Sequence, residues 1–191
     1  MRRLLFTFAA LAFAVVGLAG RGYAYSYAAA GAEPLLDGRE ALFAAVMAGD
    51  WNAAATAVAG MQADLAYLDG HEDPGIDKAF ADALAAKDAK AVQAAFTRAA
   101  SAEIVRRLNG ARDNLMDYQT AKVLVVKAQR FYTAVAGDLD PAVSAKIDDG
   151  LKRALDAIGN PGVFGVGARK PDAAAFAAAR ADILTALGRT A

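Results

Sequence analysis

Apolar side chains recur every three or four residues through almost all of the chain after residue 36, which is the period of an amphipathic helix. The breaks in this period fall at Gly, Pro, Asn and Asp, the residues that begin and end helices. No stretch alternates apolar and polar residues as a strand does. We therefore expect an all-α, single-domain helical bundle of about six to seven helices built from antiparallel hairpins. The predicted helices cover residues 37–48, 50–69, 75–87, 88–109, 112–136, 141–158 and 172–188.

Acidic residues stand where several of these helices are predicted to begin. Asp37 precedes Glu40 by three residues, which is the spacing of a capping box. Asp50 and Asp88 precede the second and fourth predicted helices, where their side chains can accept hydrogen bonds from unpaired backbone N–H groups. Pro141 suits the first turn of the sixth helix. The fifth helix has the broadest apolar stripe, and we expect it at the centre of the bundle.

The connection over residues 159–171 is rich in glycine. It lacks the Gly-Lys-Ser/Thr of a Walker loop, and no strand precedes it, so it predicts no nucleotide site. Arg169 and Lys170 stand just before a predicted helix N-terminus, where an anion can bind, although a packed connector is the simpler interpretation. Three apolar residues of this connection are expected to pack against the end of the bundle: Val163, Phe164 and Val166.

The first 24 residues have the pattern of a secretory signal peptide. Two arginines follow Met1, an uncharged apolar segment covers residues 4–20, and small residues come next. The segment is shorter than the roughly 20 apolar residues that a membrane-spanning helix needs, although a retained anchor is the alternative. Cleavage is predicted after residue 24, or as late as residue 28. Residues 25–36 then form an irregular lead, and residues 37–191 form the helical-bundle domain.

Composition narrows the function further. The 191 residues include no cysteine, 21 basic and 21 acidic residues. Without cysteine the chain can form no disulfide, thiolate metal site, lipoprotein anchor or covalent link to haem c. Loss of the signal peptide removes three arginines and leaves a net charge of about −3, which disfavours binding to nucleic acid. We therefore expect a periplasmic protein that binds neither nucleic acid nor nucleotide.

The densest group of polar residues lies between the second and third predicted helices. Carboxylates suit hard cations, and an added imidazole suits iron, zinc, copper or nickel. A solvated turn with capping acids is the structural alternative. The single histidine of the chain belongs to this group, which favours a site for iron or another divalent transition metal. The candidate ligands are Tyr67, Asp69, His71, Glu72 and Asp73.

Other residues are expected to be structural. Glu103 borders the apolar stripe of the fourth helix, and we expect it to pair with Arg107 at the edge of the bundle rather than to bind a metal. One histidine among acids, with no nucleophile elbow, gives no Ser–His–acid arrangement, so we expect no enzyme activity. Three methionines are expected to fill the core rather than to bind copper: Met47, Met61 and Met116.

Two short motifs carry a family resemblance: Ala48-Gly49-Asp50-Trp51 and Tyr67-Leu68-Asp69-Gly70-His71-Glu72. Around them, residues 41–108 resemble the extracytoplasmic helical domain of bacterial Ftr-type high-affinity iron permeases. His71 stands where that family usually has Phe, and the family's membrane helices and Arg-Glu-x-x-Glu motif are missing from this sequence. The resemblance implies a periplasmic accessory of iron uptake that binds or transfers metal beside a membrane iron permease. It assigns metal binding to the Tyr, Asp and Glu of the second motif.

Two other functions remain open at this point. A helical module without a ligand of its own could act as a scaffold or interaction partner in a periplasmic or membrane complex. A bundle lined by alanines could also enclose a small apolar molecule. Both alternatives use the same fold and differ from the metal hypothesis only in what the protein binds.

Overall fold

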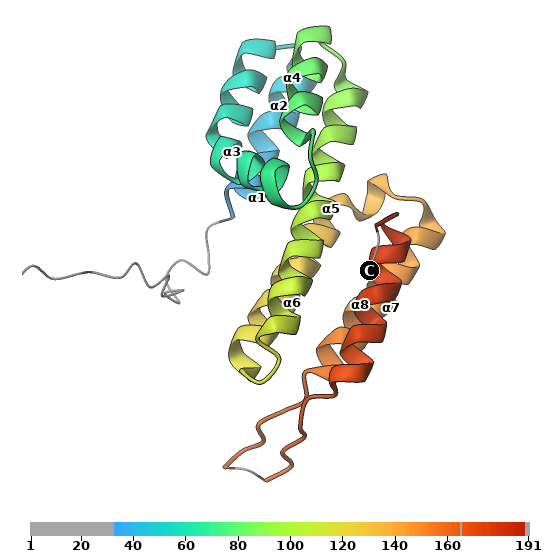
Figure 1. Cartoon of the computed structure of the whole chain (residues 1–191). Coiled ribbons are helices and arrows are strands. Elements are labelled where there is room, and N and C mark those ends of the chain that lie inside the picture. The colour runs from blue at the N-terminus through green and yellow to red at the C-terminus, as the bar shows by residue number, and fades with distance from the viewer. Residues whose placement is uncertain (1–32, 165, 190–191) are drawn as a thin grey trace, which may run out of the picture. The chain divides into compact units, whose positions relative to one another are not determined.

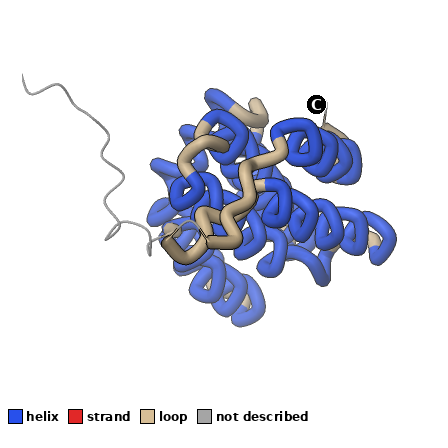
Figure 2. The backbone as a smooth tube through the Cα atoms, turned by 90° about the horizontal axis from the view of Figure 1, so that it is seen from below, coloured by secondary structure: helices blue, strands red, loops and turns tan. Residues whose placement is uncertain are grey.

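Helices account for most of the chain that the computed structural model describes, which is residues 33–164 and 166–189. Tracing these residues shows helices joined by loops and no β-strand (Figure 2). The all-α prediction is therefore confirmed, and Glu33–Ala191 forms one compact unit. The predicted signal peptide and residues 25–32 of the predicted lead lie outside the described residues. Figure 1 labels the helices α1 (Pro34–Asp37), α2 (Arg39–Ala48), α3 (Trp51–His71), α4 (Ile76–Ala86), α5 (Ala89–Asp113), α6 (Tyr118–Val135), α7 (Pro141–Ala157) and α8 (Ala173–Ala186), and a 3-10 turn, η2 (Ala136–Asp138), follows α6.

Aspartate side chains cap the N-termini of five of the helices by accepting hydrogen bonds from backbone N–H groups of the first turn. The capping predictions for Asp50 and Asp88 are confirmed. The capping box predicted for Asp37 and Glu40 is wrong, because Gly38 precedes α2 and Asp37 instead accepts a hydrogen bond from the backbone N–H of Glu33. The five capping residues are Asp50, Asp88, Asp117, Asp140 and Asp172.

Several predicted helix ends are wrong. Residues 34–37 form a helical turn where an irregular lead was expected. The helix α3 continues through Gly70, and α5 continues through Asn109 and Gly110. A Cβ atom at Gly110 would lie 3.2 Å from Leu124 Cδ1, so this glycine lets α5 and α6 approach closely instead of ending a helix. The next helix, α6, consequently begins six residues later than predicted, at Tyr118 rather than at residue 112.

The central helix is α5, not α6 as the sequence predicted. It contacts α3, α4, α6 and α8. Six consecutive residues of α5, 99–104, are buried, so its whole circumference is covered there. On α6, Val126 is 40% exposed, so the broad apolar stripe of this helix is not buried across its whole width. Alanines supply much of the buried surface of α5, which is why its apolar stripe looked narrower in sequence than it is in the fold.

The last two long helices, α7 and α8, pack directly on each other. A Cβ atom at Gly150 in α7 would lie 2.4 Å from the Cγ1 atom of Ile183 in α8, so the glycine is required for this approach. The loop between these helices projects from their ends (Figure 1). None of the described helices combines the length and the apolar character that crossing a membrane requires.

Candidate functional site

The five predicted metal ligands lie close together in sequence at the end of α3 and in the turn that leads to α4. Tyr67, Asp69 and His71 belong to the last turns of α3, and Glu72 and Asp73 follow it. Their hydrogen-bond partners differ from one residue to the next.

Asp69 stabilises the start of α4. Its Oδ1 atom accepts hydrogen bonds from the backbone N–H groups of Gly75, at 2.8 Å, and Asp77, at 3.0 Å. Gly75 precedes α4 with a φ of +97°, a left-handed conformation that glycine adopts without strain. Because the first N–H groups of a helix have no partner within the helix, Asp69 acts as a cap from the preceding helix.

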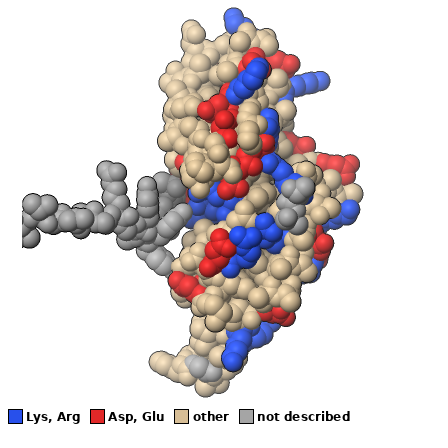
Figure 3. Space-filling model, viewed as in Figure 1, with Lys and Arg blue, Asp and Glu red and all other residues tan. Residues whose placement is uncertain are grey.

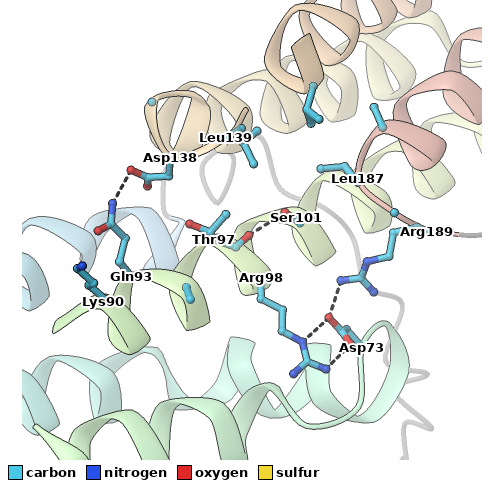
Figure 4. Close-up of a pocket in the computed structure, with 15 residues that line it drawn as sticks. Asp73, Lys90, Gln93, Thr97, Arg98, Ser101, Asp138, Leu139, Leu187 and Arg189 are labelled. Atoms are coloured by element: carbon cyan, nitrogen blue, oxygen red, sulfur yellow. Dashed lines mark hydrogen bonds and ion pairs between the residues drawn. The ribbon is translucent and has the colours of Figure 1, made fainter. Parts of the chain in front are cut away.

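Asp73 joins the α3–α4 turn to α5 and to the residues that follow α8 (Figure 4). Arg98 donates to its Oδ1 and Oδ2 atoms at 2.6 and 2.8 Å, and Arg189 also donates to Oδ2. The hydrogen bonds from Arg98 and the charge of Arg189 hold the pKa of Asp73 below its ordinary value. Both carboxylate oxygens therefore have cationic partners from distant parts of the chain.

The rings of Tyr67 and His71 stack on the surface of α3. Their centroids lie 4.4 Å apart with an angle of 13° between the planes, and the guanidinium of Arg106 lies 5.2 Å from the Tyr67 centroid. The Nδ1 atom of His71 lies 2.9 Å from the backbone carbonyl oxygen of Tyr67, which can only accept. Neutral His71 therefore carries its hydrogen on Nδ1 and its lone pair on Nε2, the tautomer that binds a metal through Nε2.

Glu72 is half-buried near charges of both signs. Burial raises the pKa of its carboxyl above the ordinary value, with a further increase from Glu103, while the positive charge of Arg106 opposes the increase. Across the described ranges, 33–164 and 166–189, no group of three or more His, Cys, Asp or Glu side chains is arranged to hold a metal ion. A metal site at this turn therefore stays a prediction.

An open cleft runs between α5, the η2 turn and the end of α8, with Asp73 at one end (Figure 4). Gln93 on α5 reaches across to Asp138 in η2, and its Nε2 donates to the aspartate Oδ1. The Ser101 hydroxyl donates to the backbone carbonyl of Thr97 at 2.7 Å. The bond between Gln93 and Asp138 therefore joins α5 to η2 across the cleft, whereas the Ser101 bond lies within α5.

A second group of charged residues lies in the interior. Glu33 pairs with Arg107 at 2.6 Å and with Lys127 at 2.7 Å, and Glu103 pairs with Arg107 at 3.1 Å and with Arg106 at 2.7 Å. The side chains other than Arg106 are at most 7% exposed. The predicted pair of Glu103 and Arg107 is confirmed, but it lies in the interior rather than at the edge. The pairs fasten Glu33 to α5 and α6.

Residues 160–164 and 166–169 form a hairpin that projects from the ends of α7 and α8 (Figure 1). Backbone hydrogen bonds join Asn160 to Arg169 at 2.7 and 2.8 Å, and Val163 to Val166 at 3.0 and 3.1 Å. A Cβ atom at Gly162, whose φ is +73°, would lie 2.5 Å from the Val166 carbonyl oxygen. The glycines therefore allow the two arms to come close together, which explains the composition of this connection.

The expectation that the apolar residues of this loop pack against the bundle is wrong. Val163, Phe164 and Val166 are 73%, 103% and 79% exposed, and we call these three residues the hairpin tip. The hairpin's own backbone bonds hold the tip away from the helices. The Phe164 backbone has a φ of +52°, in the left-handed region that aromatic residues rarely adopt. The tip thus contributes exposed apolar surface and no core packing.

The base of the hairpin carries charges of both signs. Arg169 donates to the side chain and the backbone carbonyl of Asp156 at 2.8 and 3.0 Å, and Lys170 is exposed. The side chain of Asp172 caps the start of α8 by accepting a hydrogen bond from a backbone N–H group. In the space-filling view, no Lys, Arg, Asp or Glu colours the outer end of the projecting loop, and Lys or Arg atoms lie near its base (Figure 3).

Exposed large apolar residues elsewhere are scattered. The expectation that three methionines fill the core holds only for Met61, which is buried, because Met47 and Met116 are 88% and 89% exposed. Met47 lies in the last turn of α2, and Met116 lies in the turn between α5 and α6. Among the described residues, the hairpin tip is therefore the place where three such side chains occur within four positions of the sequence.

No protein-family model, curated protein or solved structure matches the chain. The resemblance to the iron-permease domain therefore stays a prediction that rests on its two short motifs.

Proposed function

We propose that the protein is an exported, non-catalytic interaction module that attaches to a periplasmic or membrane structure through its 160–169 hairpin. The single observation that carries this proposal is the exposed hairpin tip. Exposed apolar residues that occur singly are normal on a protein surface, whereas a contiguous group marks a contact site. The three tip residues have no role in the core, so their apolar surface is left for a contact with another structure.

The surroundings of the predicted metal ligands support this choice. Asp69 caps α4, and Asp73 is held by two arginines. A metal that recruited either carboxylate would have to break hydrogen bonds that brace the turn. Carboxylates with such partners fit a structural role better than an ion site.

A sedimentation experiment with native membranes tests the proposal. We expect the protein to sediment with these membranes, and the variant Val163→Ser/Phe164→Ser/Val166→Ser to remain in the supernatant. Met47→Ser/Val126→Ser removes exposed apolar side chains outside the hairpin and serves as the matched control. Equal sedimentation of the parent protein and the hairpin variant, or no sedimentation of either, would show that the hairpin does not attach the protein to membranes.

Binding of iron or another divalent transition metal is the second candidate function, because the Nδ1 contact of His71 leaves the lone pair on Nε2. Its ligands would be His71 and Glu72 together with Tyr67, and its partner would be a membrane iron permease. Calorimetric titration with Fe(II), Fe(III), Cu(II) and Zn(II) tests it. This candidate requires a dissociation constant below about 1 mM that is lost in His71→Ala/Glu72→Ala and retained in Asp82→Asn. Unchanged binding in the double variant would exclude this site.

A further inference from the structure

The hairpin pairs part of its own backbone next to the tip. Val163 and Val166 exchange both of their N–H and C=O groups, as Asn160 and Arg169 do nearer the base. Unpaired backbone groups are costly in hydrocarbon, where no water can bond to them. A segment that adds to a sheet edge, in contrast, needs free N–H and C=O groups to pair with the partner strand. The pairing of Val163 with Val166 therefore lowers the cost of placing these two residues in an apolar medium.

The loop places a basic residue next to the apolar tip. Asp156 pairs with Arg169 and Asp172 caps α8, so the cation that can meet an anionic headgroup is the exposed Lys170, next to Arg169. Both lie on the base side of the apolar tip. Segments that lie in the lipid interface combine apolar side chains, which enter the acyl boundary, with cations that meet headgroup phosphates.

The size of the tip also favours lipid over a protein surface. A stable protein–protein interface of standard size buries about 800 Å² on each partner. Three side chains offer less than that, and a partner would need a pocket of matching shape. A bilayer requires no such pocket, and its interface accepts a single aromatic ring such as that of Phe164.

We propose that the hairpin tip inserts into the interfacial region of a lipid bilayer, with Lys170 at the level of anionic headgroups. This inference rests on the proposed function, since it names the structure to which the hairpin attaches. The tip would then act as a peripheral anchor, and the helical bundle would stay in the aqueous phase beside the membrane.

Binding to protein-free vesicles tests the inference. We expect the protein to sediment with vesicles of phosphatidylcholine and phosphatidylglycerol. The variant Val163→Ser/Phe164→Ser/Val166→Ser should lower the partition coefficient by at least about a hundredfold, because three apolar side chains are lost. Lys170→Gln should lower it about fivefold on these vesicles and leave binding to pure phosphatidylcholine unchanged. Met47→Ser/Val126→Ser should bind like the parent protein.

Two further variants keep the test independent of folding. Phe164→Gly suits a φ of +52°, so it should fold at least as well as the parent protein and still lose vesicle binding. In Phe164→Trp, the indole emission should shift to the blue on vesicles and be quenched by brominated acyl chains, above the background from Trp51. Unshifted emission, or equal binding by Phe164→Gly, would overturn the inference.

The outcomes separate the inference from the proposed function. Hairpin-dependent sedimentation with native membranes, together with no binding to either kind of vesicle, would identify a protein partner. That result would overturn lipid insertion and leave the interaction module standing. Absence of binding to both native membranes and vesicles would overturn both.

Discussion

Glu33 carries a negative charge into the protein interior, where it meets Arg107 and Lys127. Removing one partner from a buried ion group leaves uncompensated charge, which typically costs about 3–5 kcal/mol. We therefore expect Glu33→Gln to lower the free energy of unfolding by about that amount in urea titrations followed by circular dichroism. Glu40→Gln, at an exposed site in the first turn of α2, should change it by less than about 1 kcal/mol. A Glu33→Gln protein as stable as its parent would contradict this role.

Asp73 makes stability depend on pH. Its pKa is lowered in the folded protein, so its contribution is complete above the ordinary value of 3.8 and disappears as the pH falls through the lowered pKa. Asp73→Asn should cost about 1–2 kcal/mol at pH 7, since two charge-assisted partners are lost. Urea titrations over a pH series should show the variant and the parent converging in acid. Asp82→Asn, which removes an exposed pair with Lys78, should show only a small effect.

At the scale of elements, replacing either of two glycines inside helices by alanine should change the free energy of unfolding in opposite directions. A Cβ atom at Gly150 would clash with Ile183, whereas nothing lies within 4 Å of one at Gly60 in α3. Gly150→Ala should therefore lower the free energy of unfolding by about 1–3 kcal/mol through overpacking. Gly60→Ala should raise it by about 0.5–1 kcal/mol, because alanine favours a helix. Thermal unfolding distinguishes the two variants. Equal shifts of their midpoint temperatures from that of the parent protein would contradict the close approach of α7 and α8.

The helices themselves were predictable, since their period and their Asp and Pro signals depend on neighbouring residues. Asp50, Asp88 and Pro141 mark the starts of α3, α5 and α7 as expected. Gly110 was misassigned because a glycine that ends a helix and one that lets two helices approach look alike in sequence. Only the distance to Leu124 separates the two roles.

At the scale of the whole molecule, contacts between distant residues could not be predicted. Glu33 and Arg107 are 74 residues apart, and Glu33 lies outside any helical pattern. The partners of Asp73 lie on α5 and beyond α8, so an acid that looked free to bind metal is held by arginines. The period shows which face of a helix is apolar but not which element covers it.

The exposure of the hairpin tip could not be predicted from the sequence either. Apolar residues in a loop usually pack, and the sequence signal that distinguished this case was weak: three apolar residues among closely spaced glycines, with no helical period. The backbone bonds that hold the hairpin together decide the outcome, because they direct the tip away from the helices. Exposure of the tip is therefore a property of the folded loop rather than of its composition.

Site-specific photocrosslinking tests attachment through the hairpin most directly. A photoreactive p-benzoylphenylalanine would replace Phe164 in the full-length chain, and the same residue would replace Met47, which is also exposed but lies in α2. After irradiation with native membranes, we predict crosslinked products from position 164 and none from position 47. An absence of products from position 164, or equal products from both positions, would contradict the proposal that this protein acts through its hairpin.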